Sequence, residues 1–70
     1  MNMQTVNGWK QVSEKVWAGN GNNEIRLKNM KSGITIEVHT KEYGFESGKE
    51  KTMDEALKTV EWFMNRRPQV

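Results

Sequence analysis

The sequence predicts an α+β domain in which an antiparallel three- to four-stranded meander packs one face against one C-terminal amphipathic helix. Two patterns carry this prediction: apolar and polar residues alternate through residues 23–40, and an apolar stripe at helical spacing runs through residues 53–66. A length of 70 residues allows one small domain, residues 1–70. The alternative order is helix, three strands, helix, because residues 9–17 fit either structure.

Two strands are indicated by strict alternation. The stretch "NEIRLKN" sets Ile25 and Leu27 between charged residues, and "GITIEVHT" sets Ile34, Ile36 and Val38 between polar ones. Such alternation of β-branched and other apolar residues marks strands with one buried face, and "NMKSG" between them has the length of a hairpin turn. The segment around Tyr43 and Phe45 supplies a further strand, followed by a glycine-containing loop.

The first segment, "GWKQVSEKVWAGNGNN", is ambiguous. Trp9, Val12 and Val16 stand at helical spacing, but Val12 and Val16 also share one strand face while Trp9 and Trp17 share the other. Val and Trp favour strand, and "AGNGNN" has the chemistry of a turn between two strands. We therefore prefer strand to helix for this segment.

The C-terminal helix has a signal at each end. Thr52 and Glu55 have the spacing of a capping box, and Asp54 adds negative charge to the first turn. Arg66 and Arg67 would occupy the last turn, and Pro68 forbids continuation. The apolar stripe consists of Met53, Ala56, Leu57, Val60, Phe63 and Met64. The pattern predicts a helix over residues 53–66.

Composition excludes several classes of protein. The chain has no cysteine, which removes disulfide frameworks and thiolate metal sites. No apolar run reaches the length of a membrane span, and "MNMQTVNGWK" lacks the features of a secretory signal. We expect a cytoplasmic protein, complete as written, without membrane contact. The formal net charge is +2, and residues 1–41 carry six Lys or Arg against three Glu.

No catalytic motif is recognisable. The one histidine, His39, lies on the polar face of a predicted strand with Glu37 two residues away, which is more typical of an exposed side chain than of an acid–base pair. It has no partner residues for a metal site, and the glycines of "GNGNN" do not precede a helix as in a phosphate-binding loop. We expect a non-enzymatic binding protein without cofactor or metal.

The sheet face turned away from the helix is the first candidate surface. If Ile25, Leu27 and their neighbours meet the helix, the opposite face carries Arg26, Lys28, Thr35 and His39, and it gains Trp9, Lys15 and Trp17 if Val12 and Val16 point inward. Cations neutralise phosphates and aromatic rings stack on bases, so this combination suits nucleic acid. The expected nucleic-acid contacts are Trp17, Lys15, Arg26, Lys28 and His39. In the reverse orientation Trp9 and Trp17 become core residues.

A family resemblance supports the same interpretation. "WAGNGNNEIRLKNMKSG", followed by "TMDEALKTVEWF", resembles the three-stranded-sheet-plus-helix DNA-binding domain of phage integrase N-termini and plant ethylene-response factors. The likeness rests on Trp17, on the strand Glu24-Ile25-Arg26 and on the helix start Thr52-x-x-Glu55-Ala56, within residues 9–64. It implies that the outer sheet face enters the major groove of DNA, with contacts from Trp17, Arg26 and Lys28.

The exposed helix face is the second candidate surface. Adjacent helical residues point about 100° apart, so Phe63 falls with the apolar stripe and Trp62 on the opposite side, near Lys58 and Arg66. Trp and Arg are enriched at protein–protein hot spots. Because Trp62 and Arg66 are four residues apart, the cation can also simply cover the indole. The expected partner contacts are Trp62, Arg66 and Lys58.

Two functions follow from these surfaces. The first is nucleic-acid binding, with DNA as the leading candidate, through the outer sheet face. The alternative is a small accessory or inhibitor protein of phage or bacterial type that binds a protein partner, or a second copy of itself, through Trp62.

Overall fold

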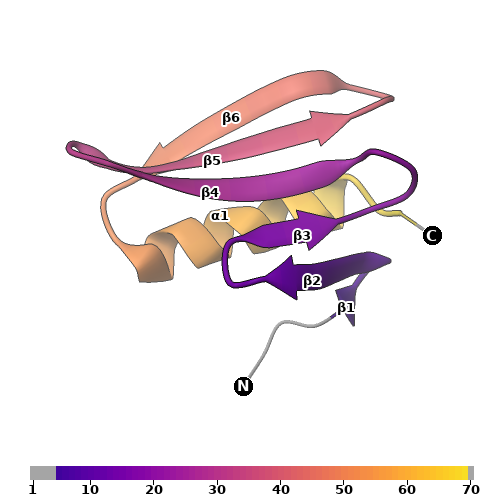
Figure 1. The fold of residues 1–70 in the computed structure, drawn as a ribbon, viewed down its shortest axis with the longest axis horizontal. Helices are drawn as coiled ribbons and strands as arrows, with labels where there is room; N and C mark the ends of the chain where they lie inside the picture. Colours follow the sequence, from indigo (N-terminus) through magenta and orange to yellow (C-terminus); the bar gives the residue numbers. More distant parts are fainter. Residues whose placement is uncertain (1–4, 70) are drawn as a thin grey trace.

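A computed structural model describes residues 5–69 and shows a six-stranded antiparallel sheet with one helix against one face (Figure 1). The strands follow one another across the sheet in chain order. This arrangement confirms the α+β class with a C-terminal helix, with more strands than predicted. The elements are β1 (Thr5–Val6), β2 (Trp9–Ser13), β3 (Val16–Ala18), β4 (Glu24–Met30), β5 (Gly33–Thr40), β6 (Gly44–Glu50) and α1 (Met53–Arg66).

The extra strands come from the N-terminal segment. The stretch predicted as one strand or one helix is a hairpin, in which β2 and β3 are joined at Glu14 and Lys15. Strand β1 precedes it across a two-residue turn, Asn7 and Gly8, both of which have positive φ. That backbone is the hairpin turn for which Asn-Gly is the preferred sequence. The preference for strand over helix is thus confirmed, and the helix alternative is wrong.

Helix α1 has the bounds that its end signals predict. The backbone amide of Glu55 donates to Thr52 Oγ1 over 3.2 Å, and the Thr52 hydroxyl lies 3.3 Å from the Glu55 carboxylate. At the other end, the Arg67 amide donates to the Phe63 carbonyl. The hydrogen bonds of the Glu55 and Arg67 amides satisfy backbone groups that a helix end leaves open. Of the predicted stripe, Met53 is 37% exposed, because it lies in the first turn, beyond the centre of the core.

The core lies between the sheet and α1. Ile25 and Leu27 of β4 and three inward residues of β5 meet the helix, as their alternation predicts. The core residues are Trp9, Trp17, Ile25, Leu27, Ile34, Ile36, Val38, Ala56, Val60, Phe63 and Met64. The N-terminal hairpin contributes Trp9 and Trp17 to this core, and both indoles are fully buried.

The segment after α1 is held against the loop between β3 and β4 by Gln69. The Gln69 side-chain oxygen accepts hydrogen bonds from the Asn20 amide at 2.8 Å and from Asn23 Nδ2 at 2.7 Å. Its Nε2 donates to the Arg67 carbonyl at 3.0 Å, and its backbone amide donates to the Asn7 carbonyl. Gln69 is buried, and its polar groups form hydrogen bonds with Asn7, with the β3–β4 loop and with Arg67. We call this buried, hydrogen-bonded side chain the Gln69 plug.

Strand β6 differs from β4 and β5 in what it turns toward the helix. Its inward residues are Glu46, Gly48 and Glu50, which lie under the flank of α1. Glu46 pairs with Arg67, and Glu50 accepts a hydrogen bond from the Thr59 hydroxyl at 2.6 Å. The consequence is that the aromatic residue of this strand, Phe45, lies on the opposite face of the sheet.

Candidate nucleic-acid interface

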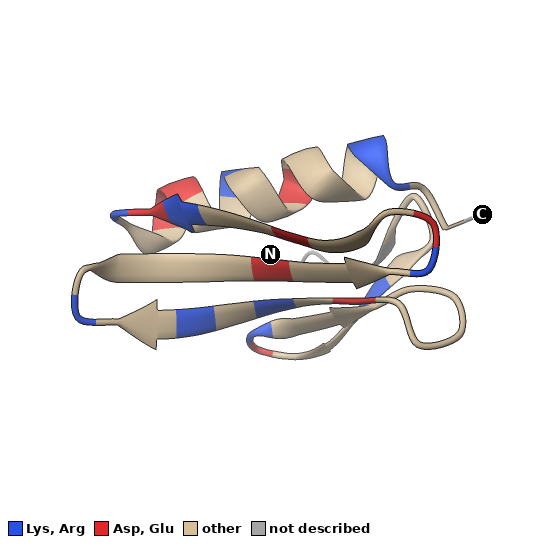
Figure 2. Ribbon diagram, turned by 90° about the horizontal axis from the view of Figure 1, so that it is seen from above, with Lys and Arg blue, Asp and Glu red and all other residues tan. Residues whose placement is uncertain are grey.

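The face of the sheet opposite α1, here called the outer face, carries cations, aromatic rings and a few small apolar residues. Its positions follow from the strand registers, since residues directly opposite each other in neighbouring strands share a face. Figure 2 shows charges of both signs on this layer and on the helix. The outer-face residues are Lys10, Val12, Val16, Ala18, Glu24, Arg26, Lys28, Met30, Thr35, Glu37, His39, Phe45, Ser47 and Lys49.

Trp17 does not belong to this face, and the prediction that it lies there is wrong. Its side chain is fully buried against the core, as is that of Trp9. The reason is the pairing of Trp17 with Ile25, which puts both side chains on the helix side and turns Val12 and Val16 outward. Two indoles bury far more apolar surface than two valines, so the hairpin adopts the orientation in which Trp9 and Trp17 are core.

Of the predicted basic residues, Arg26 and Lys28 lie on the outer face. Arg26 is exposed and donates to the Glu24 carboxylate from Nε at 3.1 Å, and this hydrogen bond raises the already high pKa of Arg26. Lys28 is exposed, with its Nζ 3.7 Å from Glu37. Lys15 is half-buried and lies in the turn between β2 and β3, and the hairpin orientation that would place it on the outer face is the one that the burial of Trp9 and Trp17 contradicts.

Two further cations, Lys10 and Lys49, share the outer face, and the sequence pattern did not indicate them. Lys49 is in register with Thr35, which in turn is in register with Lys28. Lys28 and Lys49 are therefore two strand spacings apart, about 10 Å. Within residues 5–69, Lys49 forms no ion pair. Its position could have been predicted only with the register of β6, which the sequence pattern leaves open.

His39 is exposed, as predicted, and it has an aromatic neighbour. Phe45 lies opposite it on β6, with ring centroids 4.8 Å apart and planes at 60°. Phe45 is 58% exposed. The sequence reasoning missed Phe45 as a surface residue. The alternation in "GFESGKE" taken alone would put Phe45 in the core and the glutamates outside, so only the pairing of β6 with β5 assigns Phe45 to the outer face.

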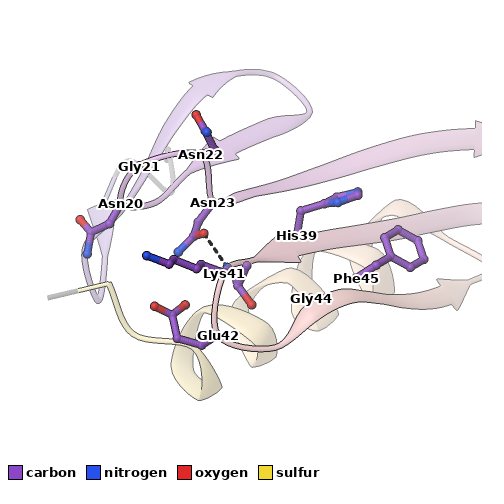
Figure 3. Close-up of a pocket in the computed structure, with 10 residues that line it drawn as sticks. Asn20, Gly21, Asn22, Asn23, His39, Lys41, Glu42, Gly44 and Phe45 are labelled. Carbon is purple, nitrogen blue, oxygen red and sulfur yellow. Dashed lines mark hydrogen bonds between the residues drawn. The ribbon is translucent and has the colours of Figure 1, made fainter.

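Two recesses adjoin His39 at the end of the sheet where the β3–β4 loop and the β5–β6 turn meet. The first, of about 610 Å³, lies between Asn22, Lys41 and Phe45, and Figure 3 shows His39 and Phe45 side by side on its wall. The second, of about 410 Å³, is lined by Val12, Val16, Ala18 and Glu24. Both recesses are open to solvent and share residues 21–23 and His39.

The exposed face of α1 has the arrangement that the helical spacing predicts. Trp62 is 49% exposed while Phe63 is buried, and their rings meet edge to face with centroids 5.1 Å apart. The Arg66 guanidinium lies over the Trp62 indole at 4.6 Å. Lys58 is exposed on the same side of the helix. Both alternatives for Trp62 therefore stand, because Arg66 covers part of the ring and the rest is free.

Within residues 5–69, no group of three or more His, Asp or Glu side chains is arranged to hold a metal ion. The single helix of this part of the chain is too short and too polar to cross a bilayer. Comparisons of the chain with protein-family models, with curated proteins and with solved structures find no match.

Proposed function

We propose that this chain is a non-catalytic nucleic-acid-binding module that uses the outer face of its sheet. The observation that carries the proposal is the exposed Phe45–His39 ring pair on the same face as Arg26, Lys28 and Lys49. Cations neutralise phosphates and flat rings stack on bases, and this face offers both.

The charge balance of the two faces supports this choice. The outer face carries four cations, Lys10, Arg26, Lys28 and Lys49, against Glu24 and Glu37. Both glutamates are already paired with a cation of the same face. The solvent face of α1 has more acid than base, since it carries Asp54, Glu55 and Glu61 against Lys58 and Arg66. A polyanion is therefore attracted to the sheet rather than to the helix.

Binding of fluorescently labelled oligonucleotides at several salt concentrations tests the proposal. We expect the double variant Lys28→Ala/Lys49→Ala to weaken binding of any sequence. It should also reduce the slope of log affinity against log salt by about 0.7 to 0.9 for each phosphate that no longer pairs with a lysine. Lys58→Ala is the matched control, because it removes an exposed lysine from the opposite side of the molecule. Absence of binding at low salt, or an equal weakening in the Lys58 variant, would overturn the proposal.

The Trp62 surface supports a second candidate function, association with a protein partner or with a second copy of the chain. A half-exposed indole beside an arginine has the composition of an interface hot spot. If the chain forms a homodimer through Trp62, sedimentation velocity should show a concentration-dependent dimer that Trp62→Ala abolishes. Met53→Ala, at an exposed apolar residue of the first helical turn, is the control. A wild-type chain that stays monomeric at all concentrations excludes the homodimer.

A further inference from the structure

The two recesses beside His39 adjoin each other at one end of the outer face. They share His39 and the loop residues 21–23, so the imidazole stands between a recess walled by Phe45 and a recess floored by Val16 and Ala18. Their volumes of about 610 and 410 Å³ fall within the usual size of small-molecule sites. Each recess thus offers an apolar or aromatic surface with polar groups at its rim.

The polar rim includes the side-chain amide of Asn22, on a loop that is hydrogen-bonded to Gln69 through Asn20 and Asn23. Asn20 and Asn23 are occupied, because both donate to Gln69 and Asn23 also accepts a hydrogen bond from the Lys41 amide at 2.9 Å. Asn22 makes no side-chain hydrogen bond to any other residue of the described range, and Figure 3 shows it projecting from the loop, away from Asn23. A free amide can both donate to and accept from the edge of a base.

The dimensions of the sheet determine which form of nucleic acid can reach these recesses. Six strands span about 24 Å between the first and the last, which is twice the roughly 12 Å width of the major groove of B-DNA. The outer face therefore cannot lie flat in that groove. The bases of a duplex are also stacked and paired, so they cannot turn into recesses on a protein surface, whereas those of a single strand can.

We propose that the outer face binds single-stranded nucleic acid, with two successive unpaired bases seated in the two recesses on either side of His39. This inference rests on the proposed function and specifies its ligand. The base in the first recess stacks on Phe45 and the base in the second lies against Val16 and Ala18. The Asn22 amide meets a base edge, and the phosphates continue across the sheet toward Arg26, Lys28 and Lys49.

A comparison of strands with and without bases tests this proposal. The probes are an oligothymidine, the oligouridine of equal length, and an abasic strand of equal length that keeps the phosphates and lacks the bases. We expect the wild-type chain to bind at least one base-containing strand about five-fold or more tightly than the abasic strand. Phe45→Leu should remove most of that difference and leave binding of the abasic strand unchanged. Trp62→Leu, which alters an exposed aromatic residue on the helix, should change neither.

The possible outcomes distinguish failure of the proposed base seating from failure of the proposed function. Equal affinity for base-containing and abasic strands would overturn the seating of bases while leaving phosphate binding by the outer face intact. Binding of a duplex at low salt without binding of any of these strands would overturn the single-strand proposal alone, and failure to bind both duplex and single strands would overturn the proposed function itself. Because Phe45 is exposed, the Phe45→Leu chain keeps its core, and an amide NMR spectrum that matches the wild type outside β5 and β6 verifies this. Ring-proton shifts of His39 on addition of oligothymidine, absent with the abasic strand, give an independent readout.

Discussion

Arg67 and Glu46 form a two-point ion pair that ties the chain just beyond α1 to strand β6. The guanidinium donates from Nε at 2.9 Å and from Nη2 at 2.6 Å to the two carboxylate oxygens. The same guanidinium lies 3.7 Å from the centre of the Tyr43 ring. The three side chains close one corner of the molecule, where no apolar residue of β6 is available to do so.

The Arg67–Glu46 pair predicts a pH dependence of stability. Hydrogen bonding from Arg67 lowers the pKa of Glu46 below its ordinary value of 4.5, whereas the unfolded chain keeps that value. The pair therefore contributes its full stabilisation above pH 4.5 and loses it as the pH falls through the lowered pKa. We expect Glu46→Gln to lower the Tm at neutral pH and to flatten its decline below pH 4.5, as measured by circular dichroism. Glu42→Gln, on the exposed β5–β6 turn, should leave the profile unchanged.

The hydrogen bonds of the Gln69 plug predict that substitution of Gln69 lowers the stability of the fold markedly. Gln69→Ala leaves the Asn20 amide and the Asn23 side chain without their acceptor, and an unsatisfied buried group costs about 1–3 kcal/mol. We expect a destabilisation of that size in urea denaturation and faster amide exchange at Asn20. Gln11→Ala is the control, since Gln11 makes one long hydrogen bond of 3.5 Å, and its destabilisation should stay within about 0.5 kcal/mol. Equal effects in the two variants would contradict the role of the plug.

Gly19 lies directly against the side chain of Gln69. A Cβ atom at Gly19 would lie 2.5 Å from Gln69 Oε1, which is closer than atoms tolerate. We expect Gly19→Ala to destabilise the wild-type chain by about 1–3 kcal/mol through this overpacking. In a chain that already carries Gln69→Ala the same substitution should cost less, because the obstructing side chain is gone. A double-mutant cycle measures the difference, and strictly additive effects would show that the two residues do not interact.

The two buried tryptophans differ in the hydrogen bonding of their indole N–H groups, so the same substitution can be compared at both positions. Trp9 Nε1 donates to the Arg67 carbonyl at 2.8 Å, whereas Trp17 Nε1 is buried and has no hydrogen-bond partner within residues 5–69. Replacement by Phe shrinks each ring similarly but removes a hydrogen bond only at Trp9. We expect Trp9→Phe to cost about 1 kcal/mol more than Trp17→Phe in the free energy of unfolding. The reverse order would indicate that Trp17 has a bonding partner.

The capping box at the start of α1 can be tested by one conservative comparison. Thr52→Ala removes the acceptor of the Glu55 amide and should cost about 1 kcal/mol. Thr52→Ser keeps the hydroxyl and should retain most of the stability. Thermal denaturation of the two variants distinguishes a capping effect from a general effect of substitution at this exposed site.

The elements whose signals are local could be predicted from the sequence. The bounds of α1 follow from Thr52 and Pro68, and the alternation in residues 23–40 assigns the inward faces of β4 and β5 correctly. The turn Asn7–Gly8 is also a strong local hairpin signal, and the pairing of β1 with β2 that it indicates was missed.

The orientation of the β2–β3 hairpin could not be derived locally. Its turn, Glu14 and Lys15, has no turn signature, and a register shift occurs between Gln11 and Ser13. Both Trp9 with Trp17 and Val12 with Val16 form a self-consistent face. The larger apolar surface of two indoles favours Trp9 and Trp17 as the core residues only if the space beneath the sheet can hold both rings, and that space depends on contacts with distant parts of the chain. The assignment of Trp17 to the surface failed for this reason, and Phe45 was missed because the face of β6 depends on its pairing with β5.

Strand β6 ends the sheet, so within residues 5–69 one row of its backbone amides and carbonyls lacks a neighbouring strand. Such a margin invites identical chains to add on and build fibrils. Glu46 and Glu50 point under the sheet at this margin, where Arg67 and Thr59 of the same chain engage them. Charged side chains that point inward from an edge strand are among the features that discourage pairing with another strand. The residues that close a corner of the monomer thereby also make the β6 edge a poorer template for a second chain.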